Sequence, residues 1–166
     1  RCGKPVVALF LGEKPVCQDK NFYQAYTLNE AAHVAVSLLR NETVPKSYES
    51  PEERKMLESL ERFKPEEKKS IKAYYSGGTL ANEAAMLIKD ALDIDLPPED
   101  VEGYMLQLGG NVVIDLGDDA YTKGKPHPMI DPAKRIECME KAMDDPTTGV
   151  ILFDVMLGYG SHPDMA

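Results

Sequence analysis

The stretch from Asn111 to Asp131, with the sequence NVVIDLGDDAYTKGKPHPMID, contains a closely spaced group of acidic and basic residues. These residues are Asp115, Asp118, Asp119, Lys123, Lys125 and His127. The stretch begins as an apolar strand and ends at a helix cap, so the charged residues lie on the loop between them. Loops between a strand and a helix commonly run about 2–6 residues. A loop this long and this charged is typical of a binding or reactive site.

The three aspartates of this loop have two interpretations. Asp115, Asp118 and Asp119 could together hold Mg²⁺, which prefers carboxylate oxygens and water as ligands. Alternatively, their oxygens cap amide groups of the loop, or Lys123 and Lys125 neutralise them. The sequence leaves both interpretations open.

His127 is the first candidate catalytic residue, and Lys125 is the second. His127 lies between Pro126 and Pro128, which restrict the backbone on either side of it. Such restriction suits a side chain that acts as a general acid or base, or as an acceptor of phosphate. Lys125 could bind an anion beside it. The alternative is a structural histidine that forms hydrogen bonds within its own loop.

A second loop, Ser76-Gly77-Gly78-Thr79, also joins a strand to a helix. Its glycines let a ligand approach the backbone. The N–H groups at the start of the helix favour a phosphate or a carboxylate, so all four residues are candidate anion-binding residues. The alternative is a tight turn in which Thr79 is an ordinary N-cap.

A third loop contributes Gly158, Gly160, Ser161 and His162 as candidate anion-binding residues. It again combines glycines with the expected start of a helix. His162 could face the same pocket as His127. The alternative is a turn followed by a helix cap.

Apolar runs and helix-start signals predict the elements that position these loops. Strands are predicted at 5–12, 71–75, 112–116 and 150–157, and helices at 27–40, 51–63, 79–92 and 131–144. The segments 13–26 and 93–110 are predicted to be irregular. The alternation indicates an α/β fold, with a parallel sheet covered by helices. Ligands of such sheets bind outside the carboxyl ends of the strands, where the three loops begin. In the last helix, Ile136, Met139 and Met143 are expected to face the core.

The composition limits the classes of partner. The 166-residue chain has a net charge of −9 and a pI of about 4.8, which argues against nucleic acid and anionic membranes as partners. No apolar run approaches the roughly 20 residues that a membrane span needs, and no signal peptide is visible. Cys2, Cys17 and Cys138 are widely spaced, so neither a disulfide framework nor a zinc site is expected. These features predict a cytoplasmic protein.

Four stretches of the chain resemble the FdrA family of acyl-CoA synthetase-like proteins, which are relatives of the succinyl-CoA synthetase α and β subunits. They are KPVVALFLG, YYSGGTLANEAA, IDLGDDAYTKGKPHPMIDPAKR and ILFDVMLGYGSHPD. The resemblance implies a flavodoxin-like fold of the succinyl-CoA synthetase ligase-domain type. It makes residues 1–45 the end of a first ligase domain or an N-terminal strand–helix unit. Residues 46–70 become a helical linker, and residues 71–166 the truncated start of a second ligase domain.

The same resemblance implies a chemistry. It implies acyl or carbamoyl transfer through an acyl-phosphate-type anion, with carbamoyl phosphate or oxamate as ligands in allantoin or purine catabolism. The implied cofactors are Mg²⁺ and CoA or an acyl phosphate. The implied partners are a small anionic substrate, other domains of the same protein, and further subunits in a homo-oligomer or a hetero-complex.

The chain departs from the succinyl-CoA synthetase pattern at one point. Those enzymes work through a phosphohistidine, carried on a Gly-His-Ala-Gly loop and held between two helix N-termini. Here the loop after the first strand reads EKPVCQDKNFYQAY and has no histidine. Two other functions therefore stay open. One is a nucleotide-dependent acid–thiol ligase that is phosphorylated on His127 or His162, and the other is a non-catalytic subunit or assembly module.

Overall fold

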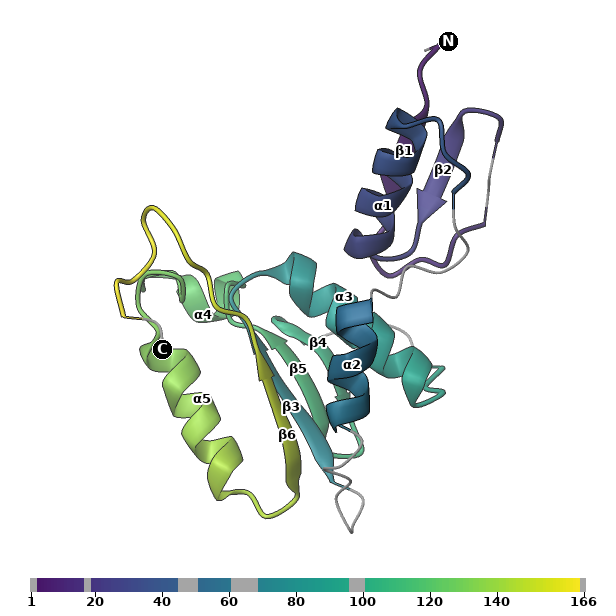
Figure 1. Cartoon of the computed structure of the whole chain (residues 1–166). Coiled ribbons are helices and arrows are strands. Elements are labelled where there is room, and N and C mark those ends of the chain that lie inside the picture. Colours follow the sequence, from purple (N-terminus) through teal and green to yellow (C-terminus); the bar gives the residue numbers. More distant parts are fainter. Residues whose placement is uncertain (1–2, 17–18, 45–50, 61–68, 96–100, 165–166) are drawn as a thin grey trace. The chain divides into compact units, whose positions relative to one another are not determined.

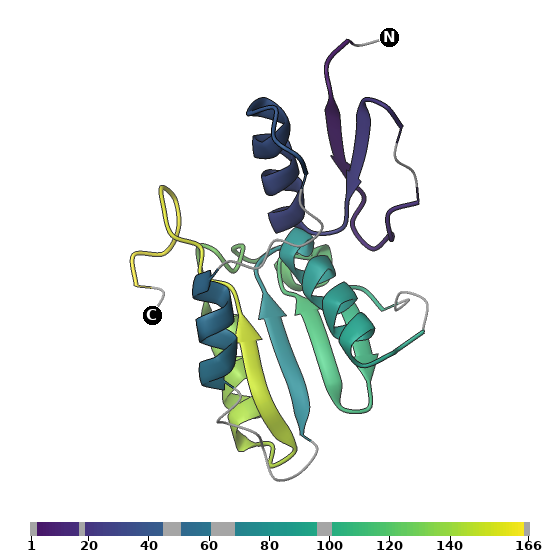
Figure 2. The same ribbon diagram turned by 45° about the vertical axis from the view of Figure 1, so that its right-hand side comes forward.

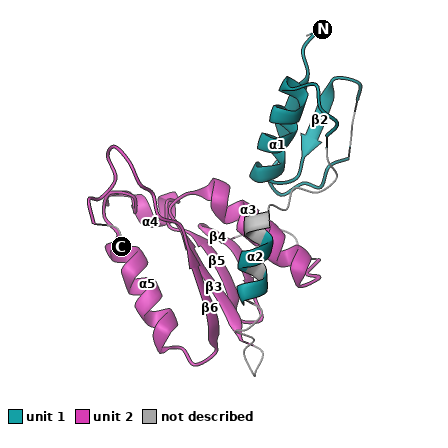
Figure 3. Cartoon of the chain, in the orientation of Figure 1, with its two compact units in different colours: residues 1–64 teal, residues 65–166 magenta. Residues whose placement is uncertain are grey.

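A computed structural model of the chain describes residues 3–16, 19–44, 51–60, 69–95 and 101–164 (Figure 1). The chain divides into two compact units, residues 1–64 and residues 65–166 (Figure 3). The division falls within the segment 46–70 that the sequence predicts to be a helical linker. Of that segment the structure describes helix α2, Pro51–Leu60, and residues 69–70. The remainder lies outside the described residues, as do Cys2 and Cys17.

The described part of the first unit contains two strands followed by two helices, the second of which is α2. Strand β1, Val6–Leu9, pairs in parallel with strand β2, Phe22–Ala25. Helix α1, Leu28–Leu39, comes directly after β2. The helix begins here because the Thr27 hydroxyl accepts a hydrogen bond from the backbone N–H of Glu30 at 3.1 Å, which serves a group that has no partner inside the helix.

The second unit is a four-stranded sheet with the strand order β4-β5-β3-β6 (Figures 1 and 2). The strands are β3 (Ser70–Tyr75), β4 (Tyr104–Leu108), β5 (Asn111–Asp115) and β6 (Thr148–Phe153), and the helices are α3 (Gly78–Ala91), α4 (Asp119–Thr122) and α5 (Ala133–Asp144). Strand β3 pairs in parallel with β5 and β6, whereas β4 runs antiparallel to β5. The prediction of an α/β, flavodoxin-like fold with helices covering a mostly parallel sheet is therefore confirmed.

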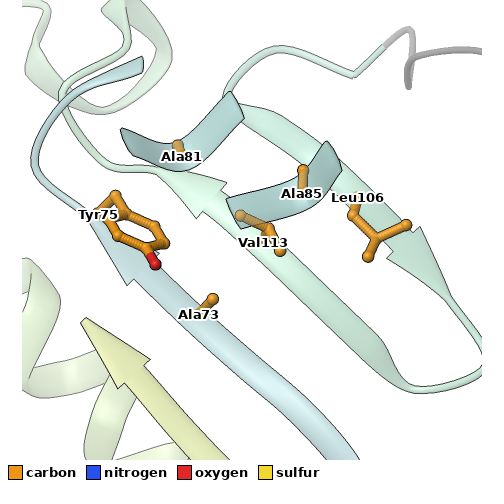
Figure 4. Close-up of a cluster of buried hydrophobic side chains, with 6 residues drawn as sticks. All are labelled: Ala73, Tyr75, Ala81, Ala85, Leu106 and Val113. Carbon is orange, nitrogen blue, oxygen red and sulfur yellow. The ribbon is translucent and has the colours of Figure 1, made fainter. Parts of the chain in front are cut away.

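Two apolar clusters hold helices against the two faces of this sheet. The cluster beneath α3 consists of Ala73, Tyr75, Ala81, Ala85, Leu106 and Val113 (Figure 4). Ala81 and Ala85 present only methyl groups, so α3 can approach the sheet closely. The cluster beneath α5 consists of Tyr74, Ile114, Leu116 and Ala142. Successive residues of β3 thus face different helices, as the pleat of a strand requires.

Two strands lie where the sequence predicts irregular chain, and those two predictions are wrong. Strand β2 lies within 13–26, and β4 lies within 93–110. The polar stretch QDKN precedes β2, and Pro97-Pro98 and Gly109-Gly110 flank β4, so both segments have the composition of loops. Gly109-Gly110 is the turn of the β4–β5 hairpin, and both residues have a positive φ, 58° and 87°. A glycine pair that indicated a break in structure therefore marks a hairpin.

Helix α5 buries a different face from the one expected. Ile136 and Met143 are 49% and 65% exposed, so their predicted place in the core is wrong. Arg135 and Ala142 are buried instead, and Met139 packs against the cluster beneath the helix as predicted. The apolar pattern of α5 indicates the wrong buried face because a charged residue, Arg135, lies in the core.

Leu106 tests the placement of β4. We expect Leu106→Ala to lower the free energy of unfolding by about 2–5 kcal/mol, because this side chain is 1% exposed within the cluster beneath α3. Leu108 of the same strand is 40% exposed, so Leu108→Ala is the matched control and should cost less than about 1 kcal/mol. Urea denaturation followed by circular dichroism measures both losses. Equal losses would contradict this assignment of buried and exposed positions along β4.

Candidate active site

Three polar residues stand at the carboxyl ends of the three parallel strands of the second unit. Ser76 follows β3, Asp115 is the last residue of β5, and Asp154 follows β6. Strand β6 ends at Phe153, four residues earlier than predicted, and this places Asp154 at the edge of the sheet. These strands run parallel (Figure 2). Their carboxyl ends, and with them all three residues, therefore lie at the same edge of the sheet.

A buried hydrogen-bonded network ties two of these strand ends to α5. The N–H and Oγ of Ser76 both donate to Asp154 Oδ1, at 2.9 and 3.0 Å. Arg135 Nη1 donates to Ser76 Oγ at 3.2 Å and to the Asp154 carbonyl at 2.6 Å, and it lies 3.5 Å from Asp154 Oδ1. The side chains of Arg135 and Asp154 are only 3% and 8% exposed. The polar groups of Ser76 are thus engaged within the protein.

The first turn of α3 lies beside Asp115. The N-cap of this helix is Gly77 and not Thr79, and it contributes no side chain to the first N–H groups. A Cβ placed on Gly78 would lie 3.1 Å from Asp115 Oδ2, so the carboxylate is next to the N-terminal end of the helix. That end carries a partial positive charge and attracts anions. Thr79 is exposed at the same end.

Gly117 is the point where the functional groups of three segments meet. A Cβ placed there would lie 2.6 Å from the Ser76 carbonyl oxygen, 2.8 Å from His127 Nε2 and 3.1 Å from Asp115 Oδ1. The Gly117 N–H also donates to Asp115 Oδ1 at 2.8 Å. Only glycine leaves room for this convergence. The loop that follows β5 therefore brings His127 back to the strand edge.

The hydrogen bonds of His127 define its tautomer. Its Nδ1 accepts the backbone N–H of Met129 at 3.2 Å, so the hydrogen of the neutral ring is on Nε2. Its carbonyl accepts the N–H groups of Ile130 and Asp131, at 2.8 and 3.0 Å. His127 thus makes the structural hydrogen bonds that the alternative interpretation expected. Its Nε2–H still points to the neighbourhood of Gly117 and Asp115 and can donate there.

Burial raises the pKa of Asp115 above its ordinary value of 3.8, and the nearby carboxylates of Asp118 and Asp154 act in the same direction. The N–H of Gly117 and the charge of His127 lower this pKa, and they offset part of the effect of burial. Asp115 is only 7% exposed at the edge of the sheet. A buried carboxyl group with a raised pKa is a common feature of functional sites.

The three aspartates proposed for Mg²⁺ do not converge. Asp115 accepts from Gly117, and Asp118 Oδ1 accepts the N–H of Ala120 at 2.9 Å to start α4. Asp119 is exposed in the first turn of α4. Within the described ranges no group of three or more metal-ligating side chains is present. Capping of loop amides, the second interpretation, is what Asp115 and Asp118 do.

Lys125 and His127 occupy different surroundings. Lys125 is exposed and lines a cavity of about 260 Å³ that His127 does not line. Only Pro126 separates the two candidate catalytic residues in the sequence, but they do not line this cavity together.

The third glycine loop is a turn that is joined to the His127 loop. Ser161 donates to the Gly158 carbonyl through its N–H and its hydroxyl, at 3.3 and 2.7 Å. Gly158 and Gly160 have positive φ angles of 141° and 88°. The backbone N–H of His162 donates to the Met129 carbonyl at 2.9 Å, whereas its ring interacts with the backbone of its own segment. No helix begins between residues 158 and 164, and a helix that starts after Asp164 would lie outside the described residues.

Three residues of this edge were missed by reasoning from the sequence. Asp154 had a detectable signal, because it directly follows an apolar strand as Ser76 does. Gly117 and Arg135 had no such signal in the sequence. The close approach of other groups to Gly117 and the burial of Arg135 both depend on tertiary packing.

The order β4-β5-β3-β6 and the polar strand edge define a flavodoxin-like α/β domain with its candidate site at the carboxyl ends of the strands. Residues 74–166 match the family model described as CoA-ligase, and the chain belongs to this family. The chain is also 33% identical over 171 residues to the uncharacterized protein YahF of Escherichia coli (strain K12). That similarity covers 98% of this chain but only 33% of YahF. None of the helices in the described ranges could span a membrane.

Arg135 tests the network at the strand ends. We expect Arg135→Met to lower the free energy of unfolding by about 3–5 kcal/mol, because it leaves the carboxylate of Asp154 buried without its cationic partner. Lys134→Met is the matched control on the neighbouring residue. Lys134 forms an exposed ion pair with Glu137, and such pairs contribute about 1 kcal/mol or less. Equal losses of stability in the two variants would contradict the network.

Asp115 gives a pH test. Its folded-state pKa lies above the ordinary 3.8, so the unfolded chain releases this proton first as the pH rises. The favourable contribution of this group is complete below about pH 3.8 and is lost as the pH rises through the raised pKa. We therefore expect Asp115→Asn to gain stability relative to the unaltered chain between about pH 3 and about pH 7. Chemical denaturation at each pH measures this difference, with Asp119→Asn as the control for charge. A difference that falls with rising pH would contradict the account.

Proposed function

We propose that this chain is part of an FdrA-like, acyl-CoA synthetase-related protein that transfers an acyl or carbamoyl group through an acyl-phosphate-type anion. The convergence of Asp115, His127 and the first turn of α3 at Gly117 is the observation that carries the proposal. Membership of the CoA-ligase family supports acyl-group chemistry in general. The carbamoyl group and oxamate rest on the resemblance of the sequence stretches.

The anion in this proposal binds at the N-terminal end of α3. The N–H groups of Gly78 and Thr79 belong to the first turn, which has no side-chain cap. They offer donors and partial positive charge to a phosphate or a carboxylate. Ser76 holds this loop in place through its hydrogen bonds to Asp154, and it does not itself bind the ligand.

His127 acts in this proposal as a neutral hydrogen-bond donor. Its Nδ1 accepts from Met129, so its Nε2–H is the group that faces the strand edge. A donor at this point stabilises negative charge that develops on the ligand or on its leaving group. Because Lys125 lines a different cavity, His127 carries this role alone.

Asp115 makes the proposed binding dependent on Mg²⁺. Its carboxylate lies beside the place proposed for the anion, where two negative charges repel each other. Mg²⁺ is commonly held by one or two carboxylates together with the phosphates of a substrate. Asp115 is placed to be such a single protein ligand, and the metal would neutralise both charges. CoA, further domains of the protein and additional subunits belong to the proposal for the complete protein.

Acid–thiol ligation of the succinyl-CoA synthetase type is the second candidate, and family membership favours it. It requires a phosphohistidine, whereas the hydrogen bond from Met129 leaves the Nε2 of His127 protonated. That nitrogen must lose its hydrogen before it can accept phosphate. Acid-labile labelling of the full-length protein by ATP and Mg²⁺ on His127 or His162 would favour this candidate over the first.

Ligand binding tests the first candidate. We expect carbamoyl phosphate with Mg²⁺ to raise the midpoint of thermal unfolding, because a ligand of the native state at 100 times its Kd adds about 2.7 kcal/mol of stability. The same titration should give no rise with His127→Ala. His33→Ala, an exposed histidine on α1, is the matched control and should respond like the unaltered chain.

Two results would reject this function. One is the absence of any midpoint shift with carbamoyl phosphate, oxamate or succinate in the presence of Mg²⁺. The other is an equal shift in the His127→Ala variant. A full-length protein that binds partner chains but none of these anions would instead support an assembly module.

A further inference from the structure

The cavity beside Lys125 has walls that are mainly apolar. Leu116, Tyr121, Pro126 and Pro128 form these walls. Leu116 is 1% exposed and Pro128 is buried, so both are fixed parts of the fold. The volume, about 260 Å³, is below the roughly 300–1,000 Å³ of pockets for larger ligands. The cavity therefore suits a small molecule with an apolar body.

Most of the charged groups that line this cavity already have partners. Glu137 accepts from Lys134 at 3.0 Å and from Lys141 at 2.6 Å, and these bonds lower the pKa of Glu137 to about 2. Glu137 is therefore ionised and neutralised by its neighbours. Asp131 Oδ1 accepts the N–H of Ala133 at the start of α5.

The hydroxyl of Tyr121 is also engaged. Burial and the hydrogen bond with Tyr104 raise the pKa of Tyr121 to about 12, so its ring is a neutral wall at physiological pH. Lys125 differs from these residues. Its backbone N–H donates to the Thr122 carbonyl, but its ammonium forms no hydrogen bond or ion pair within the part of the chain that the structure describes. The cavity thus offers apolar walls and one cation, Lys125, that has no partner among the described residues, beside the paired charges of Lys134 and Glu137 and the carboxylate of Asp131.

We propose that this cavity binds a small monocarboxylate, with the carboxylate on the Lys125 ammonium and an apolar body against Leu116, Tyr121 and Pro128. One unpaired ammonium matches one negative charge. A phosphate dianion needs more donors than the cavity provides, and a neutral molecule leaves Lys125 without a partner. This site is separate from the edge at Gly117, and it does not rest on the function proposed there.

Titration with benzoate tests this site. Two-dimensional ¹H–¹⁵N NMR of the chain follows the backbone signals of Tyr121, Lys125 and Lys134. We expect saturable shifts of these signals with benzoate and with butyrate. Benzamide, which has the same ring without the charge, should bind at least tenfold more weakly. Inorganic phosphate should give no saturable shift at these residues.

Two lysine variants separate the cavity from general attraction to positive charge. Lys125→Met keeps the length of the side chain but removes its charge, and we expect at least a tenfold loss of benzoate affinity. Lys123→Met removes the same charge from an exposed residue that does not line the cavity, and should bind like the unaltered chain. His127→Ala should also retain benzoate binding, so that failure at the Gly117 edge and failure here can be told apart.

Each contrary result overturns the proposal. The absence of saturable shifts with the unaltered chain shows that the cavity has no affinity for carboxylates. Equal binding of benzamide or phosphate shows that the ligand class is wrong. Equal losses in Lys125→Met and Lys123→Met show that the attraction is not local to the cavity.

Discussion

The buried contact between Arg135 and Asp154 is the interaction on which the geometry of the second unit depends. Together with Ser76, it joins the carboxyl ends of β3 and β6 to α5. The chain leaves β3, β5 and β6 at this same edge of the sheet. An isolated charge at 3% exposure would be costly, but here each partner satisfies the other and the hydroxyl of Ser76 completes the network. The network therefore sets the position at which α3 begins.

Once that position is set, one glycine determines what can meet at the edge of the sheet. Gly117 lets the Ser76 carbonyl, Asp115 and His127 approach within a space that a methyl group would fill. The prolines on either side of His127 and the bond to Met129 hold the ring in one orientation. The ring of His127, the carboxylate of Asp115 and the N-terminal end of α3 thus come together near Gly117. Lys125 does not belong to this group, although only Pro126 separates it from His127, and it lines a cavity that His127 does not line.

The sequence predicted the α/β class and the three loops at the strand ends because long apolar runs alternate with helix-start signals. It did not predict β2, which follows the polar stretch QDKN, or β4, which lies between Pro97-Pro98 and Gly109-Gly110. Asp115 and His127 could be selected by residue type and position. The burial of Arg135 could not, since its helix shows a plausible apolar face in Ile136 and Met143 that the structure leaves exposed. The separation of Lys125 from His127 likewise depends on how the loop folds, and nothing in the spacing of these residues indicates it.

The central claim is that an acyl-phosphate-type anion binds at the N-terminal end of α3 beside Asp115 and His127. The most direct measurement is a ¹H–¹⁵N NMR titration of the chain with acetyl phosphate and Mg²⁺. The account predicts that the amide signals of Gly78, Thr79 and Gly117 shift together with a single affinity, and that they do not shift when Mg²⁺ is omitted. Shifts confined to other residues, or no saturable shift at these three, would contradict it.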